Sequence, residues 1–166
     1  LAIRATSVYS DFINLLDDEA RELWQATDIK SALPNLRFTP TADESRELNF
    51  IKSGAIIIAG SGMCTGGRIR HHLAQNISRR ECHVVIVGYQ AAGTPGRALV
   101  DGAKHLRLFG EDIPVRAKIH TIGGLSAHAG QAELLAWYDA FRNRPPLILV
   151  HGEPQAQATL KDLIRQ

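Results

Sequence analysis

Cysteine, methionine and long hydrophobic runs are scarce in this chain of 166 residues. Its two cysteines, Cys64 and Cys82, lie far apart and lack Cys-x-x-Cys spacing, so neither a disulfide framework nor a zinc knuckle is indicated, and free thiols in a reducing cytosol are expected. No apolar stretch approaches the ~20 residues that a membrane helix needs, and no signal-peptide pattern opens the chain. The sequence therefore predicts a cytoplasmic protein that does not associate with a membrane.

Neither sign of charge dominates the sequence. Lys and Arg number 19 against 17 Asp and Glu, for a formal net charge of +2, which excludes a strongly basic surface overall but leaves room for a local basic patch. The length and an apolar content of 45% fit one ordinary domain, or one domain with a small appendage. Because the only methionine is Met63 and the chain opens with Leu1, we expect a piece of a longer polypeptide.

From residue 54 onward, short apolar runs alternate with glycine loops and helical stretches. Residues 55–59 and 83–89 are predicted strands, since continuous β-branched runs are typical of central parallel strands. Each is followed by a glycine loop and a predicted helix, at 68–77 and 97–103. Downstream we expect a hairpin with strands at 106–109 and 115–122, a helix at 131–142, a strand at 147–150 and a helix at 154–165. This alternation predicts an α/β fold, a layered sandwich with a largely parallel central sheet flanked by helices.

The first third of the chain is predicted to be scaffold. Apolar residues recur at three- and four-residue spacing over residues 2–26, which predicts one helix, or two with a break near Leu16. A short strand is expected at residues 36–39. Residues 41–44 have capping-box spacing and predict a helix over residues 45–50.

Two histidines stand where the edge of a sheet would bring side chains together. His128 follows one β-like run and His151 follows the predicted strand at 147–150, and both sit among small residues that leave the imidazoles reachable. In open α/β sheets, ligands bind beyond the carboxyl ends of the strands. His128 and His151 are therefore the first candidate site residues, although two histidines alone are a poor zinc site, because even an open catalytic site usually has three protein ligands.

The other histidines fit structural roles. His71 and His72 are neighbours on a predicted helix and point about 100° apart, so they cannot both serve one metal. We expect His83, His105 and His120 to lie in strand or edge positions, with no acidic or cysteine partner nearby.

Two glycine loops lead from a predicted strand into a predicted helix. Residues 60–67 (Gly-Ser-Gly-Met-Cys-Thr-Gly-Gly) match neither Gly-x-Gly-x-x-Gly nor a Walker loop, which disfavours a nucleotide cofactor. Backbone N–H groups in such a turn attract phosphate. Because Arg68 follows this loop and Arg97 follows the second loop at 90–96, the two could contact successive phosphates of a polynucleotide. The alternative is structural: tight turns, close packing and two solvated arginines.

Four motifs follow one another along nearly the whole chain: residues 54–73 (Gly-Ala-Ile-Ile-Ile-Ala-Gly-Ser-Gly-Met-Cys-Thr-Gly-Gly-Arg-Ile-Arg-His-His-Leu), 87–97 (Val-Gly-Tyr-Gln-Ala-Ala-Gly-Thr-Pro-Gly-Arg), 124–128 (Gly-Leu-Ser-Ala-His) and 150–154 (Val-His-Gly-Glu-Pro). In this order they resemble the signatures of the β-CASP branch of the metallo-β-lactamase superfamily, which contains ribonucleases of RNA maturation and decay. The opening residues 1–6 are similar to the family's Met-Ala-x-x-Ala-Thr segment.

The resemblance implies roles for individual residues. It implies that His128 protonates the leaving oxygen or stabilises the scissile phosphate, and that His151 is a ligand to one of two zinc ions. It places the glycine loops and Ser126 along an RNA path. The expected RNA- or phosphate-binding residues are Ser61, Gly62, Gly66, Gly67, Arg68, Gln90, Thr94, Arg97 and Ser126. The chemistry it implies is hydrolysis of RNA phosphodiester bonds by a zinc-bridged hydroxide, with two metals holding the attacking and leaving oxygens.

The chain departs from the family pattern in two ways. The His-x-His-x-Asp-His motif, the further His and Asp ligands and the acidic residue of motif A are not in the sequence. Gly130 stands where the family usually has Asp, which could leave His128 less well oriented. We therefore expect residues 1–120 to form most of the β-CASP domain and residues 121–166 to be the carboxyl-terminal segment of the lactamase domain.

We hypothesise from the sequence that this chain is the carboxyl-terminal part of a zinc-dependent ribonuclease. We expect the isolated chain to be inactive and to hold no zinc or only part of the zinc site. The expected partners are RNA and the amino-terminal lactamase half, with a homodimer left open. The alternative is a non-catalytic RNA-binding or partner-binding module of the same fold.

Overall fold

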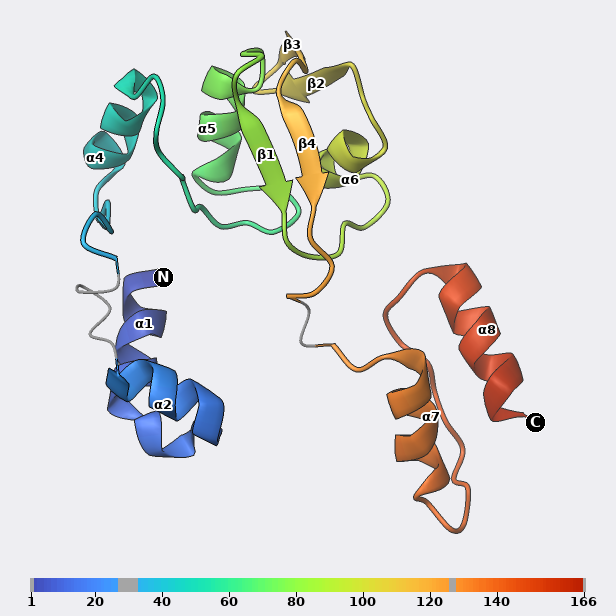
Figure 1. Ribbon diagram of the computed structural model, residues 1–166. Coiled ribbons are helices and arrows are strands. Elements are labelled where there is room, and N and C mark those ends of the chain that lie inside the picture. Colours follow the sequence, from blue (N-terminus) through green and yellow to red (C-terminus); the bar gives the residue numbers. More distant parts are fainter. Residues whose placement is uncertain (1, 27–32, 126–127, 166) are drawn as a thin grey trace. The chain divides into compact units, whose positions relative to one another are not determined.

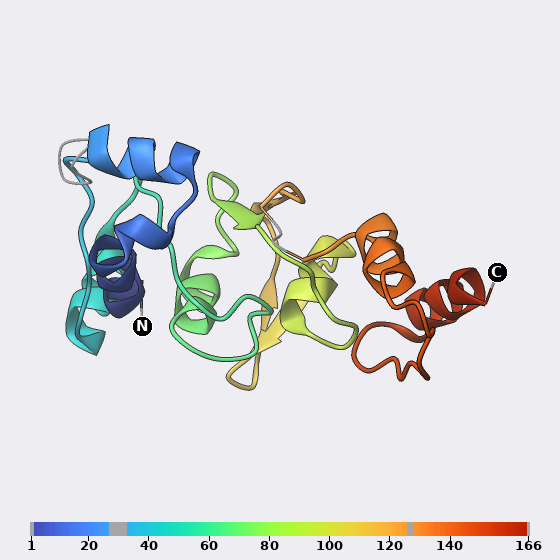
Figure 2. The same cartoon turned by 90° about the horizontal axis from the view of Figure 1, so that it is seen from below.

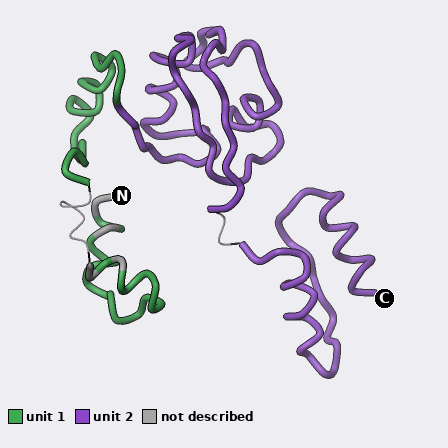
Figure 3. Tube along the Cα trace, in the orientation of Figure 1, with its two compact units in different colours: residues 1–54 green, residues 55–166 purple. Residues whose placement is uncertain are grey.

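The chain divides into two units, residues 1–54 and residues 55–166 (Figure 3). The described elements of the first unit are helices, whereas the second unit has both helices and strands. The computed structural model describes residues 2–26, 33–125 and 128–165. In those residues no helix is both long and apolar enough to cross a membrane. The mixed α/β class predicted from the sequence is confirmed.

The first unit begins with two helices separated by a short turn (Figure 1). Helix α1 (Ala2–Asp11) leads into the 3₁₀ turn η1 (Ile13–Leu15), and α2 (Asp18–Ala26) follows. The predicted break near Leu16 is confirmed. Its physical cause is the carboxylate of Asp17, which accepts a hydrogen bond from the backbone N of Ala20 at 2.8 Å and so caps α2.

A capping box starts the next helix, as predicted. In α4 (Ala42–Glu47) the backbone N of Glu44 donates to Thr41 Oγ1 at 3.2 Å, and the backbone N of Thr41 donates to Glu44 Oε2 at 3.0 Å. The 3₁₀ turn η2 (Leu48–Phe50) continues it. The strand expected at residues 36–39 is not formed, because none of the described residues pairs with this segment as a second strand.

Two parallel strands lie at the centre of the second unit. Strand β1 (His83–Ile86) pairs with β4 (Lys118–Thr121), so that Ile86 stands opposite Thr121. Helices α5 (Ile69–Asn76) and α6 (Pro95–Val100) contribute to the core beside them (Figure 1). The buried cluster is Cys64, Leu73, Ile77, Ile86, Leu99, Leu106, Leu108 and Ala117.

A hairpin completes this core. Strands β2 (His105–Leu108) and β3 (Glu111–Pro114) pair antiparallel around Phe109 and Gly110, whose φ angles are 52° and 86°. Two residues at positive φ are typical of the tight turn that suits twisted strands. The sequence predicted a hairpin here but gave its second strand to residues 115–122. That boundary is wrong, because residues 118–121 pair in parallel with β1 instead.

Two predicted strands, at 55–59 and 147–150, are not paired strands in the described structure. Ile56 and Ile58 are 92% and 90% exposed, and Ile148 and Val150 are 83% and 78% exposed. The described residues form one parallel and one antiparallel pair of strands rather than a single, largely parallel sheet. The apolar runs at 55–59 and 147–150 therefore lack the neighbouring strands that a β-strand needs to satisfy its backbone.

Two helices end the chain and lie side by side in both views (Figures 1 and 2). They are α7 (Gln131–Asp139) and α8 (Pro154–Ile164), close to the predicted ranges. The phenol of Tyr138 is buried and donates to the backbone oxygen of Pro145 at 2.8 Å. Arg144 donates to the backbone oxygen of Ile164 at 2.8 Å, which ties the connecting segment to the end of α8.

Candidate functional site

The first glycine loop, residues 60–67, folds back on itself before α5 begins. The backbone N of Cys64 donates to Ser61 O at 3.0 Å, and the hydroxyl groups of Ser61 and Thr65 lie 3.3 Å apart. Gly67 has φ +67°, and a Cβ added there would stand 2.9 Å from Gly60 O. The turn at Gly67 therefore requires glycine for two independent reasons.

The predicted phosphate-binding residues of this loop lie together. Ser61, Gly62, Gly66 and Gly67 belong to the turn, and Arg68 is the N-cap residue of α5. A Cβ on Gly62 or Gly66 would meet nothing within 4 Å, so the backbone is open to an approaching group at these two positions. The start of α5 adds backbone N–H groups and the positive end of a helix dipole, which favour an anion.

Gln90 joins the two glycine loops. Its buried side-chain amide donates to the backbone oxygens of Gly62 at 2.9 Å, Gly88 at 3.1 Å and Tyr89 at 2.9 Å. The backbone N of Gly96 in turn donates to Met63 O at 3.1 Å. Because the Gln90 amide hydrogens are used inside the protein, its position accounts for the packing of the loops, and a contact with RNA remains a prediction.

Thr94 and Arg97 order the start of α6. The Thr94 hydroxyl accepts from the backbone N of Arg97 at 3.2 Å and donates to Ala91 O at 2.7 Å, so Thr94 is the N-cap. The Nε of Arg97 donates to both carboxylate oxygens of Asp101, at 2.8 and 2.9 Å. Its Nη1 lies 3.4 Å from Glu153 Oε1. The guanidinium thus lies between two carboxylates.

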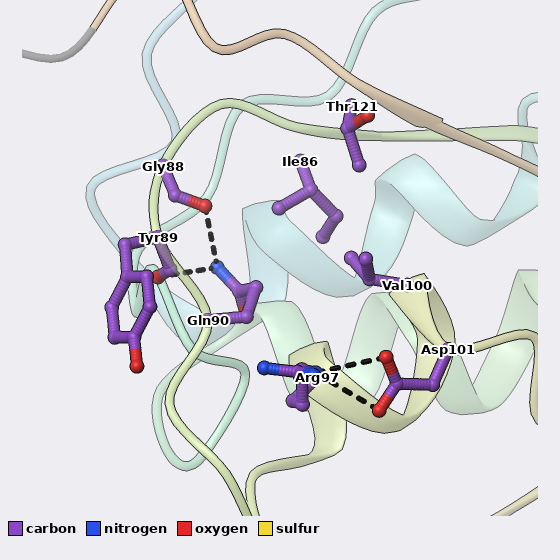
Figure 4. Close-up of a pocket in the computed structure, with 8 residues that line it drawn as sticks. All are labelled: Ile86, Gly88, Tyr89, Gln90, Arg97, Val100, Asp101 and Thr121. Atoms are coloured by element: carbon purple, nitrogen blue, oxygen red, sulfur yellow. Dashed lines mark hydrogen bonds and ion pairs between the residues drawn. The ribbon is translucent and has the colours of Figure 1, made fainter. Parts of the chain in front are cut away.

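A shallow pocket opens at the carboxyl ends of β1 and β4 (Figure 4). Its volume is about 230 Å³. Ile86 ends β1 and Thr121 ends β4, whereas Arg97, Val100 and Asp101 come from α6 and the turn that follows it. The remaining lining residues are Gly88, Tyr89 and Gln90 of the loop after β1. In parallel sheets this edge is where ligands bind.

His151 lies in a turn that other residues hold in place. It has φ +69° and Gly152 has φ +97°, and the side-chain amide of Gln157 donates to His151 O at 2.9 Å. Two residues on, Glu153 accepts a hydrogen bond from the Tyr89 hydroxyl at 2.6 Å. This bond to Glu153 raises the pKa of the Tyr89 phenol. The turn of His151 is therefore tied to the loop after β1.

His128 and His151 are both exposed. Gly130, two residues after His128, donates its backbone N–H to Glu133 Oε2 at 2.6 Å at the start of α7. Ser126, predicted to line the RNA path, lies outside the described residues. In the described parts of the chain, no three His, Cys, Asp or Glu side chains lie close enough together to hold a metal ion.

The remaining histidines differ in part from the expectation. His105 does have an acidic partner, since its Nδ1 lies 2.9 Å from Asp112 Oδ2 across the hairpin. His83 and His120 contact each other on neighbouring strands, with Nδ1 and Nε2 2.9 Å apart. His72 is buried, and burial lowers the pKa of its imidazole, with smaller contributions from His71 and Arg68. The sequence prediction missed the pair of His105 with Asp112 and the pair of His83 with His120, because each pair joins two separate strands.

Asp101 and Glu153 are the site residues that the sequence prediction missed. Asp101 stands four residues after Arg97 on one helical face, which is a readable ion-pair spacing. Glu153 carries no such signal, since its contact with Tyr89 spans 64 residues.

Known families match both parts of the chain. The Beta-Casp domain model matches residues 1–99, and a model described as the Zn-dependent metallo-hydrolase RNA specificity domain matches residues 112–166. The chain belongs to the β-CASP family of the metallo-β-lactamase superfamily.

Named relatives agree with this assignment. A ribonuclease of Thermus thermophilus is 34% identical over 164 residues, which cover 99% of this chain and 37% of the relative. Transcription termination factor FttA of Pyrococcus abyssi is 35% identical over 161 residues, 80% of this chain and 25% of the relative. An RNase J-like protein of Methanocaldococcus jannaschii is 32% identical over 151 residues, 91% of this chain and 34% of the relative. The chain thus spans 25% to 37% of the length of these relatives.

Proposed function

We propose that this chain is the RNA-facing part of a zinc-dependent ribonuclease that acts in RNA processing or decay. One structural observation carries the proposal. The two glycine loops pack together through Gln90, and the turn of His151 is tied to the second loop by the bond between Glu153 and Tyr89. The anion-friendly turns and the turn of the candidate zinc ligand His151 thus belong to one hydrogen-bonded network. Relatives named as ribonucleases support the same activity.

In this proposal RNA phosphates follow the two loops. Gly62 and Gly66 leave the backbone of the first loop open, and Arg68 stands at the start of α5. Arg97 contacts Asp101 through Nε and Glu153 through Nη1. A guanidinium has five N–H donors in a fixed fork, so Arg97 keeps donors for a phosphate while both carboxylates hold its orientation. Thr94 also belongs to the proposed path, and Ser126, which lies outside the described residues, is proposed as an RNA contact from its motif alone.

The described residues do not form a zinc site by themselves. His151 is the one residue here that matches a zinc ligand of the family, and no group of three ligand side chains is found among the described residues. A catalytic zinc site needs about three protein ligands. The other ligands must then come from the amino-terminal half, and we propose that the isolated chain does not cleave RNA.

The same half would complete the layered sandwich. Ile58 and Val150, in the apolar runs at 55–59 and 147–150, are exposed here, as expected of strands whose neighbours come from elsewhere. In the complete protein His128 would protonate the leaving oxygen or stabilise the scissile phosphate. We propose that this protein is cytoplasmic. A homodimer is the assembly to test for, and light scattering would detect it.

The test uses the full-length protein with His128→Ala and His151→Ala. We expect His151→Ala to lose bound zinc and activity together, and His128→Ala to lower the turnover of RNA while zinc content is unchanged. Zinc is measured by mass spectrometry and cleavage with end-labelled RNA. His105→Ala, which removes an exposed histidine paired with Asp112, is the control and should change neither. Equal loss of zinc in both variants would show that the two roles are wrongly divided.

A second candidate is a module that binds RNA or a partner without catalysis. This module requires no metal site in the chain, and the described residues hold no three-ligand group. The full-length protein decides between the two. Zinc-dependent cleavage that His128→Ala reduces supports the enzyme, whereas RNA binding without cleavage supports the module.

A further inference from the structure

The pocket beyond β1 and β4 has a polar rim and an apolar floor. Ile86 and Val100 form the floor, and their side chains face one another in the close-up (Figure 4). Arg97 and Asp101 stand at the rim, joined by the ion pair at 2.8 Å. Asp101 keeps an exposed side chain, so its carboxylate can still accept hydrogen bonds from a ligand.

This arrangement matches the chemistry of a nucleobase. Flat apolar faces of bases pack on apolar or guanidinium surfaces, while their edges form hydrogen bonds. Guanine places two neighbouring N–H donors beside a carbonyl acceptor on its pairing edge. Asp101 offers two acceptor oxygens, and Arg97 beside it offers a donor. Adenine offers one N–H donor group beside an acceptor nitrogen, so it engages only one carboxylate oxygen.

We propose that the pocket between the ends of β1 and β4 and helix α6 is a subsite for a guanine base of the RNA, held by the carboxylate of Asp101 and the guanidinium of Arg97. This inference rests on the proposed function, since it names the base that lies beside the RNA path. The pocket also adjoins that path directly, because Gln90 and Arg97 belong to both.

The test titrates the 166-residue chain with GMP, IMP and AMP and follows backbone amide shifts by NMR. All three carry the same ribose and phosphate, so differences in affinity report on the base. We expect GMP to bind about tenfold more tightly than AMP, the size expected for one good two-point contact. IMP lacks the exocyclic amino group and should fall between them. Equal affinities, or shifts outside residues 86–121, would overturn the assignment.

Asp101→Asn tests the carboxylate, with Asp139→Asn as its matched control. Asp139 is also an exposed acid near an arginine, 3.7 Å from Arg144, but lies in α7 away from the pocket. We expect Asp101→Asn to remove the preference for GMP and Asp139→Asn to keep it. If Asp101 serves only as a helix ion pair, Asp101→Asn lowers the melting temperature and leaves the preference intact, which overturns the proposal. The comparison of GMP with AMP on the parent chain does not depend on how the variants fold.

The two proposals can fail separately. If the isolated chain prefers GMP but the full-length protein does not cleave RNA, the proposed ribonuclease activity is wrong and the guanine subsite stands. If the full-length protein cleaves RNA but the isolated chain shows no preference for GMP, only the guanine subsite is wrong.

Discussion

Glu153 is the residue through which the last motif of the chain reaches the loop after β1. Its carboxylate accepts from the Tyr89 hydroxyl at 2.6 Å and lies 3.4 Å from Arg97 Nη1. The hydrogen bond stabilises the protonated phenol, so the pKa of Tyr89 is raised. Tyr89 therefore reports on whether the turn of His151 is docked.

Replacement of Glu153 by glutamine should lower the pKa of Tyr89 toward its ordinary value of about 10. The amide can still accept a hydrogen bond, but it lacks the negative charge that opposes the phenolate. Ultraviolet titration of tyrosinate measures the pKa, and subtraction of the Tyr89→Phe curve isolates this phenol from Tyr9 and Tyr138. Glu111→Gln, an exposed change in β3, is the control. An unchanged Tyr89 curve in Glu153→Gln would show that the contact does not form in solution.

His72 should make the stability of the chain depend on pH. Burial lowers the pKa of its imidazole below the ordinary value of about 6.5, so the unfolded chain binds a proton more readily than the folded one. The contribution of His72 to the free energy of unfolding is therefore fully present above pH ~6.5 and is lost as the pH drops below that value. Urea unfolding at pH 7.5 and 5.5 should show a smaller loss for His72→Gln than for the parent. His151→Gln, at an exposed position, should keep the loss of the parent.

At the scale of elements, the glycines of the two loops differ in why glycine is needed: because the φ angle is positive, or because a neighbouring atom leaves no room for a Cβ. Gly67 combines φ +67° with a backbone oxygen 2.9 Å from any Cβ, Gly93 has φ +79° in open space, and Gly62 has neither constraint. These three positions form a natural series for substitution by alanine.

We expect the cost in unfolding free energy to increase from Gly62→Ala to Gly93→Ala to Gly67→Ala. Gly62→Ala should stay within about 0.5 kcal/mol, because it touches nothing. Gly93→Ala should cost about 1–2 kcal/mol for the left-handed backbone. Gly67→Ala adds overpacking against Gly60 O, for about 2–4 kcal/mol in all. Urea midpoints at constant slope measure the series. Equal costs at Gly67 and Gly93 would show that the loop relaxes around the added methyl group.

Elements set by local chemistry were predicted well from the sequence. The break near Leu16, the capping box of Thr41 and helices α5 and α8 depend on residues within four positions of one another, and all are found. Strands depend on partners far along the chain. The apolar run at 115–122 therefore gave no sign that residues 118–121 would pair with β1, and the runs at 55–59 and 147–150 gave no sign of having no partner.

In the candidate site too, features set by residues close together in the sequence were predicted, whereas contacts between distant segments were not. The loops and their glycines were readable because each motif is continuous in sequence. Asp101 was within reach of a spacing argument, four residues after Arg97. The link from Tyr89 to Glu153 and the pair of His105 and Asp112 join separate segments, so only the fold reveals them.

At the scale of the whole molecule, the exposed apolar runs are where the proposed amino-terminal half should bind. Ile148 is 83% exposed in this chain, so Ile148→Asp should change the stability of the isolated chain by less than about 0.5 kcal/mol. If residues 147–150 form a buried strand in the full-length protein, the same change there buries an unpaired carboxylate. It should then cost several kcal/mol and lower the soluble yield. Ile148→Val keeps the apolar β-branched side chain and should be neutral in both. Melting temperatures of both proteins provide the comparison, and an equal, small effect of Ile148→Asp in both would show that this segment stays exposed in the full-length protein.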